Sequence, residues 1–118
     1  MKTPFVTKEK VIEIAAKYPT PFHIYDEKGI RKNAGAVKQA FAWNPGFREY
    51  FAVKANANPY IMDIFQDYDM GFDCSSAAEL LLSQAVGADG RHIMFSSNDT
   101  PEEEYALANK MGAIINLD

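Results

Sequence analysis

The sequence predicts an α/β fold in which helices cover a parallel β-sheet. Four short apolar segments recur at intervals of roughly 20 residues, the spacing expected of strands that are joined through helices by short loops. Between these segments, apolar residues lie three or four positions apart, as they do on one face of an amphipathic helix. The chain has 118 residues, of which 47% are hydrophobic, so it can bury an apolar core.

The N-terminal part, residues 1–45, is predicted to form two helices with a short strand between them. Thr7 has the side chain to cap the first helix, which we expect to end before Pro19. Residues 21–25 alternate between apolar and polar side chains as a strand does. Asp26 then suits the N-cap of the second helix.

The remaining part, residues 46–118, is predicted to repeat a strand followed by a helix. The predicted strands are residues 50–55, 70–74, 92–95 and 113–117. A four-stranded doubly wound sheet fits this pattern, and so does about half of a closed eight-stranded barrel, which needs ~250 residues when complete. A half barrel would leave open strand edges that pair with another copy or stay adhesive.

Composition argues against several classes of function. The net charge is −4 and no basic stripe is present, so nothing favours binding to nucleic acid. No apolar run approaches the ~18 residues of a membrane span. The single cysteine, Cys74, allows no internal disulfide and favours a reducing, cytoplasmic location. His23 and His92 have no partners at the spacing of a metal site or a catalytic triad, so we interpret both as structural.

Lys54 is the first candidate for chemistry, because it lies inside an otherwise apolar predicted strand. Alternation along that strand places Lys54 and Ala52 on the same face. A lysine at a strand end can simply extend its flexible stem into solvent. Alternatively, Lys54 lies in a cleft at the carboxyl edge of the sheet, where α/β proteins build their sites. Desolvation there would favour the neutral amine, which can form a Schiff base.

Asp73 is the second candidate and occupies the corresponding position in the next predicted strand. A carboxylate at this point can simply end the strand and begin a turn. Alternatively, Asp73 faces the same cleft as Lys54, one strand over and ~5 Å away. In that position its charge would hold the lysine in place.

Glu79 has a structural explanation. Residues 76–79, Ser-Ala-Ala-Glu, fit the capping box that opens a helix ahead of an apolar run. Residues 100–103, Thr-Pro-Glu-Glu, fit the same pattern with proline at the first helical position. Cys74 has no histidine placed to activate it, so we interpret it as a small buried residue.

Four segments resemble one known family. Residues 50–59 (YFAVKANANP) resemble the lysine motif of the pyridoxal-phosphate-dependent decarboxylases of the alanine-racemase fold, fold type III. Residues 71–80 (GFDCSSAAEL) resemble the family's second-strand motif, while residues 21–26 (PFHIYD) and 93–98 (IMFSSN) resemble two further strands. The similarity runs over residues 20–118 in the family's order and with its gaps, and it is greatest to the diaminopimelate decarboxylases.

The resemblance implies the N-terminal part, about four β/α units, of a pyridoxal-phosphate-binding TIM-like (β/α)8 barrel. It implies that Lys54 forms the Schiff base with the aldehyde of pyridoxal 5'-phosphate and that Ala52 leaves room beside this cofactor. Asp73 would face the lysine and the cofactor, and Glu79 would support that pocket. The implied activity is the decarboxylation of a small amino acid, most closely meso-diaminopimelate to L-lysine, by a homodimer.

Several alternatives stay open within and beyond this family. Carboxynorspermidine, ornithine and arginine decarboxylases fit the same motifs, and so does a non-catalytic relative that binds a partner protein. Racemases of the same fold fit less well, because residues 57–59 depart from their usual run. Asp99-Thr100 replaces an asparagine-lysine pair found in many relatives. The family's phosphate site and its other cofactor contacts come from later segments, so we expect the 118-residue chain alone, an N-terminal fragment, to be inactive.

Overall fold

The computed structural model describes residues 3–117 and has an α/β architecture. In chain order the elements are α1 (Lys8–Lys17), α2 (Glu27–Ala40), β1 (Tyr50–Ala52), the 3-10 helix η1 (Val53–Ala55), α3 (Pro59–Gln66), β2 (Gly71–Cys74), α4 (Ala77–Ala85), the 3-10 helix η2 (Gly90–His92), β3 (Ile93–Ser96), α5 (Glu102–Lys110) and β4 (Ile114–Asn116). No helix among these described residues is both long and apolar enough to cross a membrane.

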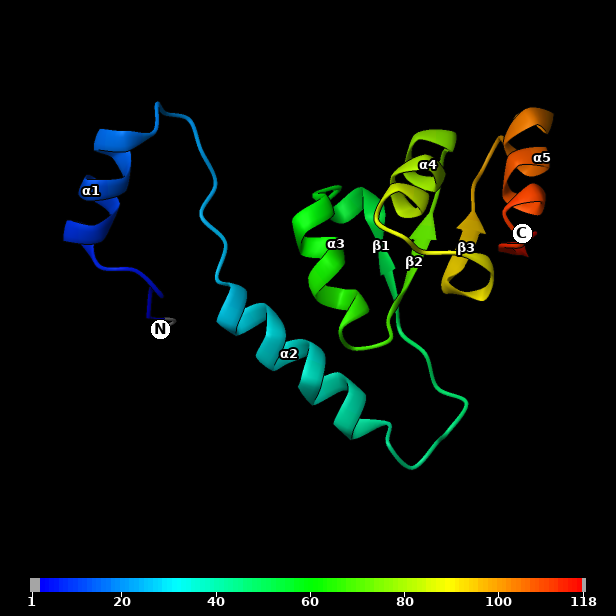
Figure 1. The fold of residues 1–118 in the computed structure, drawn as a ribbon, viewed down its shortest axis with the longest axis horizontal. Helices are drawn as coiled ribbons and strands as arrows, with labels where there is room; N and C mark the ends of the chain where they lie inside the picture. The colour runs from blue at the N-terminus through cyan, green and yellow to red at the C-terminus, as the bar shows by residue number, and fades with distance from the viewer. Residues whose placement is uncertain (1–2, 118) are drawn as a thin grey trace.

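The four strands form one parallel sheet in which spatial order follows sequence order, from β1 through β2 and β3 to β4. One α-helix lies in each connection, namely α3, α4 and α5. Because such crossovers are right-handed, an unreversed strand order places these helices on the same face of the sheet. A doubly wound sheet instead reverses its order and carries helices on both faces. The arrangement, visible in Figure 1, is therefore that of successive units of a β/α barrel.

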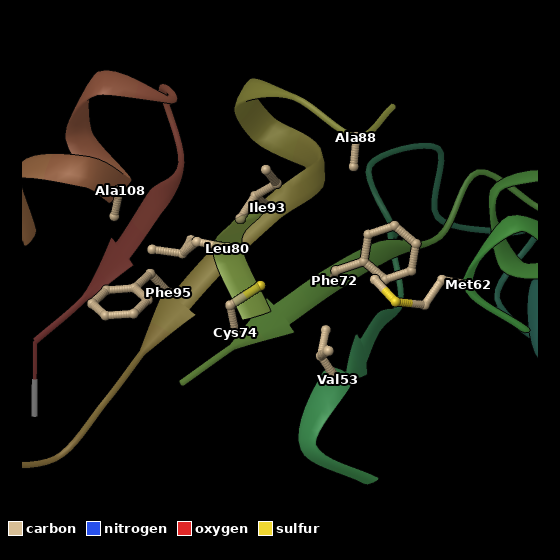
Figure 2. Packing of buried hydrophobic residues seen from close by; sticks show 9 residues of the cluster. All are labelled: Val53, Met62, Phe72, Cys74, Leu80, Ala88, Ile93, Phe95 and Ala108. Carbon is tan, nitrogen blue, oxygen red and sulfur yellow. The ribbon is translucent and has the colours of Figure 1, made fainter. Parts of the chain in front are cut away.

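The core lies between the sheet and the helices. Phe72 and Cys74 from β2 and Ile93 and Phe95 from β3 are fully buried on this covered face. Figure 2 shows them converging with residues of the helices, among them Leu80 of α4. Apolar residues at alternate positions of each strand thus explain why the helices pack on this side.

The opposite face of the sheet is not covered by any helix of the described chain. The parallel register aligns Ala52 of β1 with Asp73 of β2, Asp73 with Met94 of β3, and Met94 with Ile114 of β4. All four residues are half-buried, whereas their neighbours along each strand face the helices. In a β/α barrel the face opposite the helices is the interior, so this row of residues lines what would be the inner wall.

The N-terminal arm extends away from the sheet. Figure 1 shows α1 standing apart and joined to α2 by an extended segment. No residue of α1 is buried. The chain exposes 8412 Å², whereas a compact monomer of 13.2 kDa exposes about 6,400 Å². Its radius of gyration of 17.0 Å likewise exceeds the value of about 13.5 Å expected for a compact domain of this length. The arm and the open sheet face therefore present an unusually large surface.

Two predicted strands differ from those observed. Residues 21–25 are extended and pair with no strand of the described chain, so the strand expected there stays a prediction. The strand predicted over residues 50–55 ends at Ala52, because the chain turns into η1 to bury Val53 completely against the helices. The other three strands lie within one or two residues of their predicted positions.

Of the helix caps predicted at Thr7, Asp26 and Thr100, the structure confirms the first two and not the third. Thr7 accepts a hydrogen bond from the N–H of Lys10 at 3.2 Å, and Asp26 accepts one from that of Gly29 at 3.0 Å, so both caps are confirmed. The cap predicted at Thr100 was wrong. The Thr100 hydroxyl instead donates to the carbonyl of Ser97 at 2.9 Å inside the preceding loop, and α5 begins only at Glu102.

Candidate active site

Lys54 lies just beyond the carboxyl end of β1, in the single turn of η1. The sequence predicted that Lys54 lies within the strand. It lies outside, because the chain leaves the extended conformation at Val53. The side chain is exposed to solvent. Lys54 nevertheless lies at the carboxyl edge of a parallel sheet, which is where β/α folds carry their reactive groups.

Asp73 points from β2 onto the uncovered face, where Ala52 and Met94 are its aligned neighbours on either side. Its Oδ1 is buried and has no hydrogen-bond partner among the described residues. Buried carboxylate oxygens are almost always hydrogen-bonded, because leaving one unpaired costs about 1–3 kcal/mol or more. An unsatisfied acceptor at this point indicates a place where a donor is expected.

The expected pairing of Lys54 with Asp73 does not occur in the described chain. The register aligns Asp73 with Ala52, two residues before the lysine, and no ion pair joins the two groups there. The expectation of a desolvated amine is not met either, since Lys54 is exposed. Both differences have the same cause: the chain turns at Val53, which carries Lys54 past the end of the sheet.

Glu79 holds the connection between β2 and α4. Its Oε2 accepts the backbone N–H of Ser75 at 2.7 Å, and the Ser75 hydroxyl also donates to the carboxylate. Ser76 caps α4 through its hydroxyl, which accepts the N–H of Glu79 at 3.4 Å. The cap at Ser76 is confirmed, but Glu79 reaches one residue further back than the N-cap of a standard capping box. It thereby fixes the segment that directly follows Asp73 and Cys74.

Cys74 is buried on the helix side of the sheet and is not part of the uncovered face. Its Sγ lies 3.2 Å from the hydroxyl of Ser83. Burial raises the pKa of the thiol to about 11, with the hydrogen bond between the thiol and Ser83 acting in the opposite direction. The thiol is therefore protonated at neutral pH, which confirms its interpretation as a buried residue and not a nucleophile.

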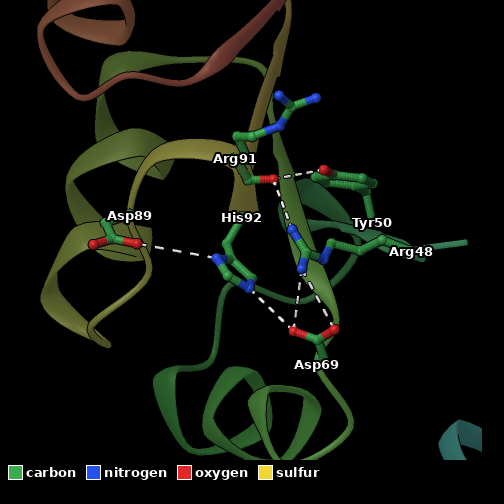
Figure 3. Close-up of polar contacts among 6 residues, drawn as sticks. All are labelled: Arg48, Tyr50, Asp69, Asp89, Arg91 and His92. Atoms are coloured by element: carbon green, nitrogen blue, oxygen red, sulfur yellow. Dashed lines mark hydrogen bonds and ion pairs between the residues drawn. The ribbon is translucent and has the colours of Figure 1, made fainter. Parts of the chain in front are cut away.

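A polar cluster at the amino ends of the strands was not predicted. Figure 3 shows Arg48 and His92 both contacting the carboxylate of Asp69, at 3.3 Å and 3.1 Å, while Arg48 and the Tyr50 hydroxyl donate to the carbonyl of Arg91. The His92 hydrogen bond, then Arg48, hold the pKa of Asp69 below its usual value. His92 is thus structural, as expected. The sequence offered one signal only, namely that these residues each lie at or just before a predicted strand.

Comparison with known proteins is consistent with this geometry. The chain is 46% identical over 106 residues to "Protein TabA" of Pseudomonas amygdali pv. tabaci, which covers 90% of this chain and 25% of that protein. It is 34% identical over 93 residues to the diaminopimelate decarboxylase of Bacteroides thetaiotaomicron, covering 79% and 24% of the two chains. The chain spans about a quarter of the length of these curated relatives.

A solved structure gives the same result for the fold. The crystal structure of diaminopimelate decarboxylase from M. jannaschi matches with a TM-score of 0.83 and 28% identity, over 91% of this chain and 26% of that one. The fold predicted from the sequence, the first units of a pyridoxal-phosphate-binding β/α barrel, is confirmed.

The family model described as "Pyridoxal-dependent decarboxylase, pyridoxal binding domain" matches residues 27–118. This range includes all four strands and the helices between them, together with Lys54, Asp73 and Glu79. Pyridoxal phosphate is the cofactor of this family. The chain therefore belongs to the pyridoxal-dependent decarboxylases, and its residues 27–118 belong to their pyridoxal-binding domain.

Proposed function

We propose that the protein containing this chain is a pyridoxal-phosphate-dependent amino-acid decarboxylase and that Lys54 is the residue that bonds the cofactor. One observation carries the proposal. Lys54 stands at the carboxyl end of β1, next to a sheet face on which Asp73 presents a buried oxygen that has no partner within residues 3–117. An accessible amine and an unsatisfied carboxylate at the same edge are the groups that an aldehyde-bearing, nitrogen-containing cofactor requires.

The residues present fit pyridoxal phosphate at its reactive end. The cofactor, when bound, supplies an electron sink for the carbanion left by decarboxylation. Lys54 would hold it through the amine, and Ala52 would leave space next to Asp73 because its side chain is a single methyl group. Asp73 would provide negative charge and a hydrogen-bond acceptor on the same face. We propose for Lys54, Ala52 and Asp73 the same roles that the resemblance to the family implies.

Glu79 would act on the cofactor site indirectly, through the backbone that it holds. Its carboxylate already accepts the N–H and the hydroxyl of Ser75, so its oxygens are engaged in holding the connection after β2. We therefore assign Glu79 the task of fixing the backbone that carries Asp73, and not direct contact with the cofactor. An exposed Lys54 is consistent with a group that must be reached by cofactor and substrate.

We propose meso-diaminopimelate as the substrate, with L-lysine and carbon dioxide as the products. Support comes from the relative named diaminopimelate decarboxylase at 34% identity and from the similar solved structure. The relative at 46% identity carries a name that states no substrate. Carboxynorspermidine, ornithine and arginine stay alternative substrates, and a non-catalytic, partner-binding relative stays the alternative function.

Three further expectations stay proposals. We propose that the protein works as a homodimer, which is what the resemblance to the family implies. We propose a reducing, cytoplasmic location, which the single buried and unpaired Cys74 supports. We also keep the division into residues 1–45, comprising a helix, an extended segment and a second helix, and residues 46–118, comprising the β/α units.

The decisive experiment traps the cofactor on its lysine. The protein that contains residues 1–118 is incubated with pyridoxal phosphate, reduced with borohydride, digested and analysed by mass spectrometry. We expect the pyridoxyl group on the Lys54 peptide, its loss in Lys54→Ala and its retention in Lys38→Ala, which removes an exposed lysine of α2. Labelling spread evenly over the exposed lysines would refute the assignment.

A second measurement addresses the substrate. Release of carbon dioxide is compared for meso-diaminopimelate, ornithine and arginine with the same loaded protein. Release from diaminopimelate alone supports the proposed substrate, and release from one of the others replaces it. A pyridoxyl adduct on Lys54 without release from any amino acid would favour the non-catalytic alternative.

A further inference from the structure

Glu104 connects two successive β/α units through a single hydrogen bond. It lies in the first turn of α5, and its Oε1 accepts the backbone N–H of Ala77, the first residue of α4, at 2.9 Å. The two residues are 27 positions apart in the sequence, and the bond is partly buried. Glu102 and Glu103 in the same turn are exposed. Only Glu104 of these three carboxylates is therefore positioned to reach α4.

The segment held by this bond adjoins the candidate active site. Residues 75 and 76 connect β2 to α4, which begins at Ala77, and they follow directly after Asp73 and Cys74. Glu79 holds the first residue of the connection through the Ser75 N–H, and Glu104 holds Ala77, the helix residue that follows the connection, through its N–H. Both ends of the connection are thus fixed by carboxylates, one from its own helix and one from the next unit.

The local electrostatics favour a carboxylate at the Glu104 position. The first turns of a helix leave backbone N–H groups without intrahelical partners and carry partial positive charge. Glu104 lies in the first turn of its own helix, α5, and contacts the first turn of α4. The rings of Tyr105 and Phe95 of β3 pack in a T-shaped arrangement, with centroids 5.9 Å apart, and this contact fixes α5 against the sheet. Glu104 is therefore presented from a well-packed helix.

We propose that Glu104 is a positioning residue for the pyridoxal site: by holding Ala77 it fixes the connection after β2 and so the orientation of Asp73 and Glu79. The inference rests on the proposed function of those two residues. Asp73 lies only four positions before Ala77, so a looser connection would move its side chain relative to Ala52 and the edge of β1.

Four variants separate this role from a general effect on stability. Glu104→Ala removes the acceptor, and Glu104→Met removes it while keeping the side-chain length, in case the alanine variant does not fold. Glu104→Gln keeps the Oε1 acceptor and provides the conservative rescue. Glu103→Ala is the matched control, because it removes a neighbouring carboxylate that is exposed.

Two readouts are taken on the protein that contains residues 1–118. Amide hydrogen exchange reports on residues 75–77, and a titration followed by visible absorption reports on the affinity for pyridoxal phosphate. We expect about tenfold faster exchange and about tenfold weaker cofactor affinity in Glu104→Ala and Glu104→Met, because a hydrogen bond to a charged acceptor is lost. Glu104→Gln keeps an acceptor but not the charge, so it should lie between the parent and these two variants. Glu103→Ala should stay close to the parent in both readouts.

The outcomes are distinguishable. Unchanged exchange and affinity in both variants without an acceptor would overturn the proposal. Faster exchange with unchanged cofactor affinity would also overturn it, because Glu104 would then serve the fold alone. If the parent itself binds no pyridoxal phosphate and gives no adduct at Lys54, the proposed function fails, and with it this role. That failure is recognised in the parent, before any variant is compared.

Discussion

Tyr50 and Gly71 are aligned partners in the parallel pairing of β1 and β2, and the Tyr50 ring lies directly over the glycine. A Cβ on Gly71 would come within 2.6 Å of the ring and within 2.7 Å of the backbone oxygen of His92. The absence of a side chain at Gly71 therefore allows the ring to cross β2 and donate its hydroxyl to the carbonyl of Arg91 at 2.6 Å. Tyr50 at the start of β1 thereby crosses the start of β2 and bonds to the segment just before β3.

The first prediction follows from this close approach. Gly71→Ala should lower the free energy of unfolding by about 1–3 kcal/mol, because the backbone oxygen of His92 cannot move aside as a flexible side chain could. Urea denaturation followed by circular dichroism measures the change. Gly46→Ala is the control, since the nearest atom to its Cβ would lie at 3.5 Å in an exposed turn. Equal stability of the two variants would contradict the explanation.

The second prediction concerns the thiol of Cys74. Because burial raises its pKa to about 11 from an ordinary value of 9.0, the folded state keeps its proton at a pH at which the unfolded state has lost it. This contribution to stability is fully present below about pH 9 and is lost as the pH rises towards 11. Cys74→Ala should therefore flatten the alkaline limb of the stability profile.

Reactivity of the same thiol gives an independent check. Alkylation by iodoacetamide at neutral pH should be slow in the folded protein and fast in urea, because only the thiolate reacts and Cys74 is fully buried. A native protein that is alkylated as fast as the unfolded chain would show that the thiol is accessible and that the burial argument is wrong.

The third prediction concerns acid stability. The hydrogen bond from His92, and then Arg48, lower the pKa of Asp69, so its contribution to stability is present above about pH 4 and lost as the pH falls through the lowered pKa. The side chain is 58% exposed, which limits the effect to less than about 1 kcal/mol. Asp69→Asn should flatten this acid limb.

The choice of asparagine isolates the charge. Asp69 has a φ of 59°, in the left-handed region, and asparagine tolerates this conformation nearly as well as aspartate. Asp63→Asn, which removes an exposed carboxylate from α3, is the control. If both variants changed the acid limb equally, the effect would come from net charge and not from the contact of Asp69 with His92 and Arg48.

The order and type of the β/α elements could be predicted from the sequence because each depends on local periodicity. The interpretation that places Asp73 on the same face as Ala52 is confirmed, because the register aligns the two residues. The end of β1 could not be predicted, since it depends on how Val53 packs against helices that are distant in the sequence. The position of Lys54 relative to Asp73 follows from that turn, so it was also beyond the reach of local patterns.

Side-chain contacts between β/α units could not be predicted from the sequence for a related reason. The capping pattern at residues 100–103 looked as good as that at residues 76–79, yet the Thr100 hydroxyl bonds to the carbonyl of Ser97 in its own loop. Glu104 has no distinguishing pattern in the sequence, yet its carboxylate reaches the first residue of α4. Such contacts depend on how neighbouring helices are packed, and neighbouring strands set that packing.

The last prediction concerns the oxygen of Asp73 that has no partner. If this carboxylate is retained for function, it is a cost to the fold, because a buried acceptor without a hydrogen bond lowers stability by about 1–3 kcal/mol. Asp73→Leu should therefore raise the free energy of unfolding by about 1 kcal/mol, with Ala52 and Met94 providing apolar neighbours. Asp73→Asn, which keeps a polar side chain, should stay within about 0.5 kcal/mol of the parent.

Towards the cofactor, the same two variants should both be impaired. Asp73→Leu and Asp73→Asn both remove the negative charge, so both should weaken the binding of pyridoxal phosphate and lower the yield of borohydride-trapped Lys54. Urea denaturation gives the stability, and absorption titration gives the affinity. A gain in stability coupled to a loss of affinity in Asp73→Leu identifies a functional carboxylate. A loss of stability in that variant would instead mean that Asp73 supports the fold.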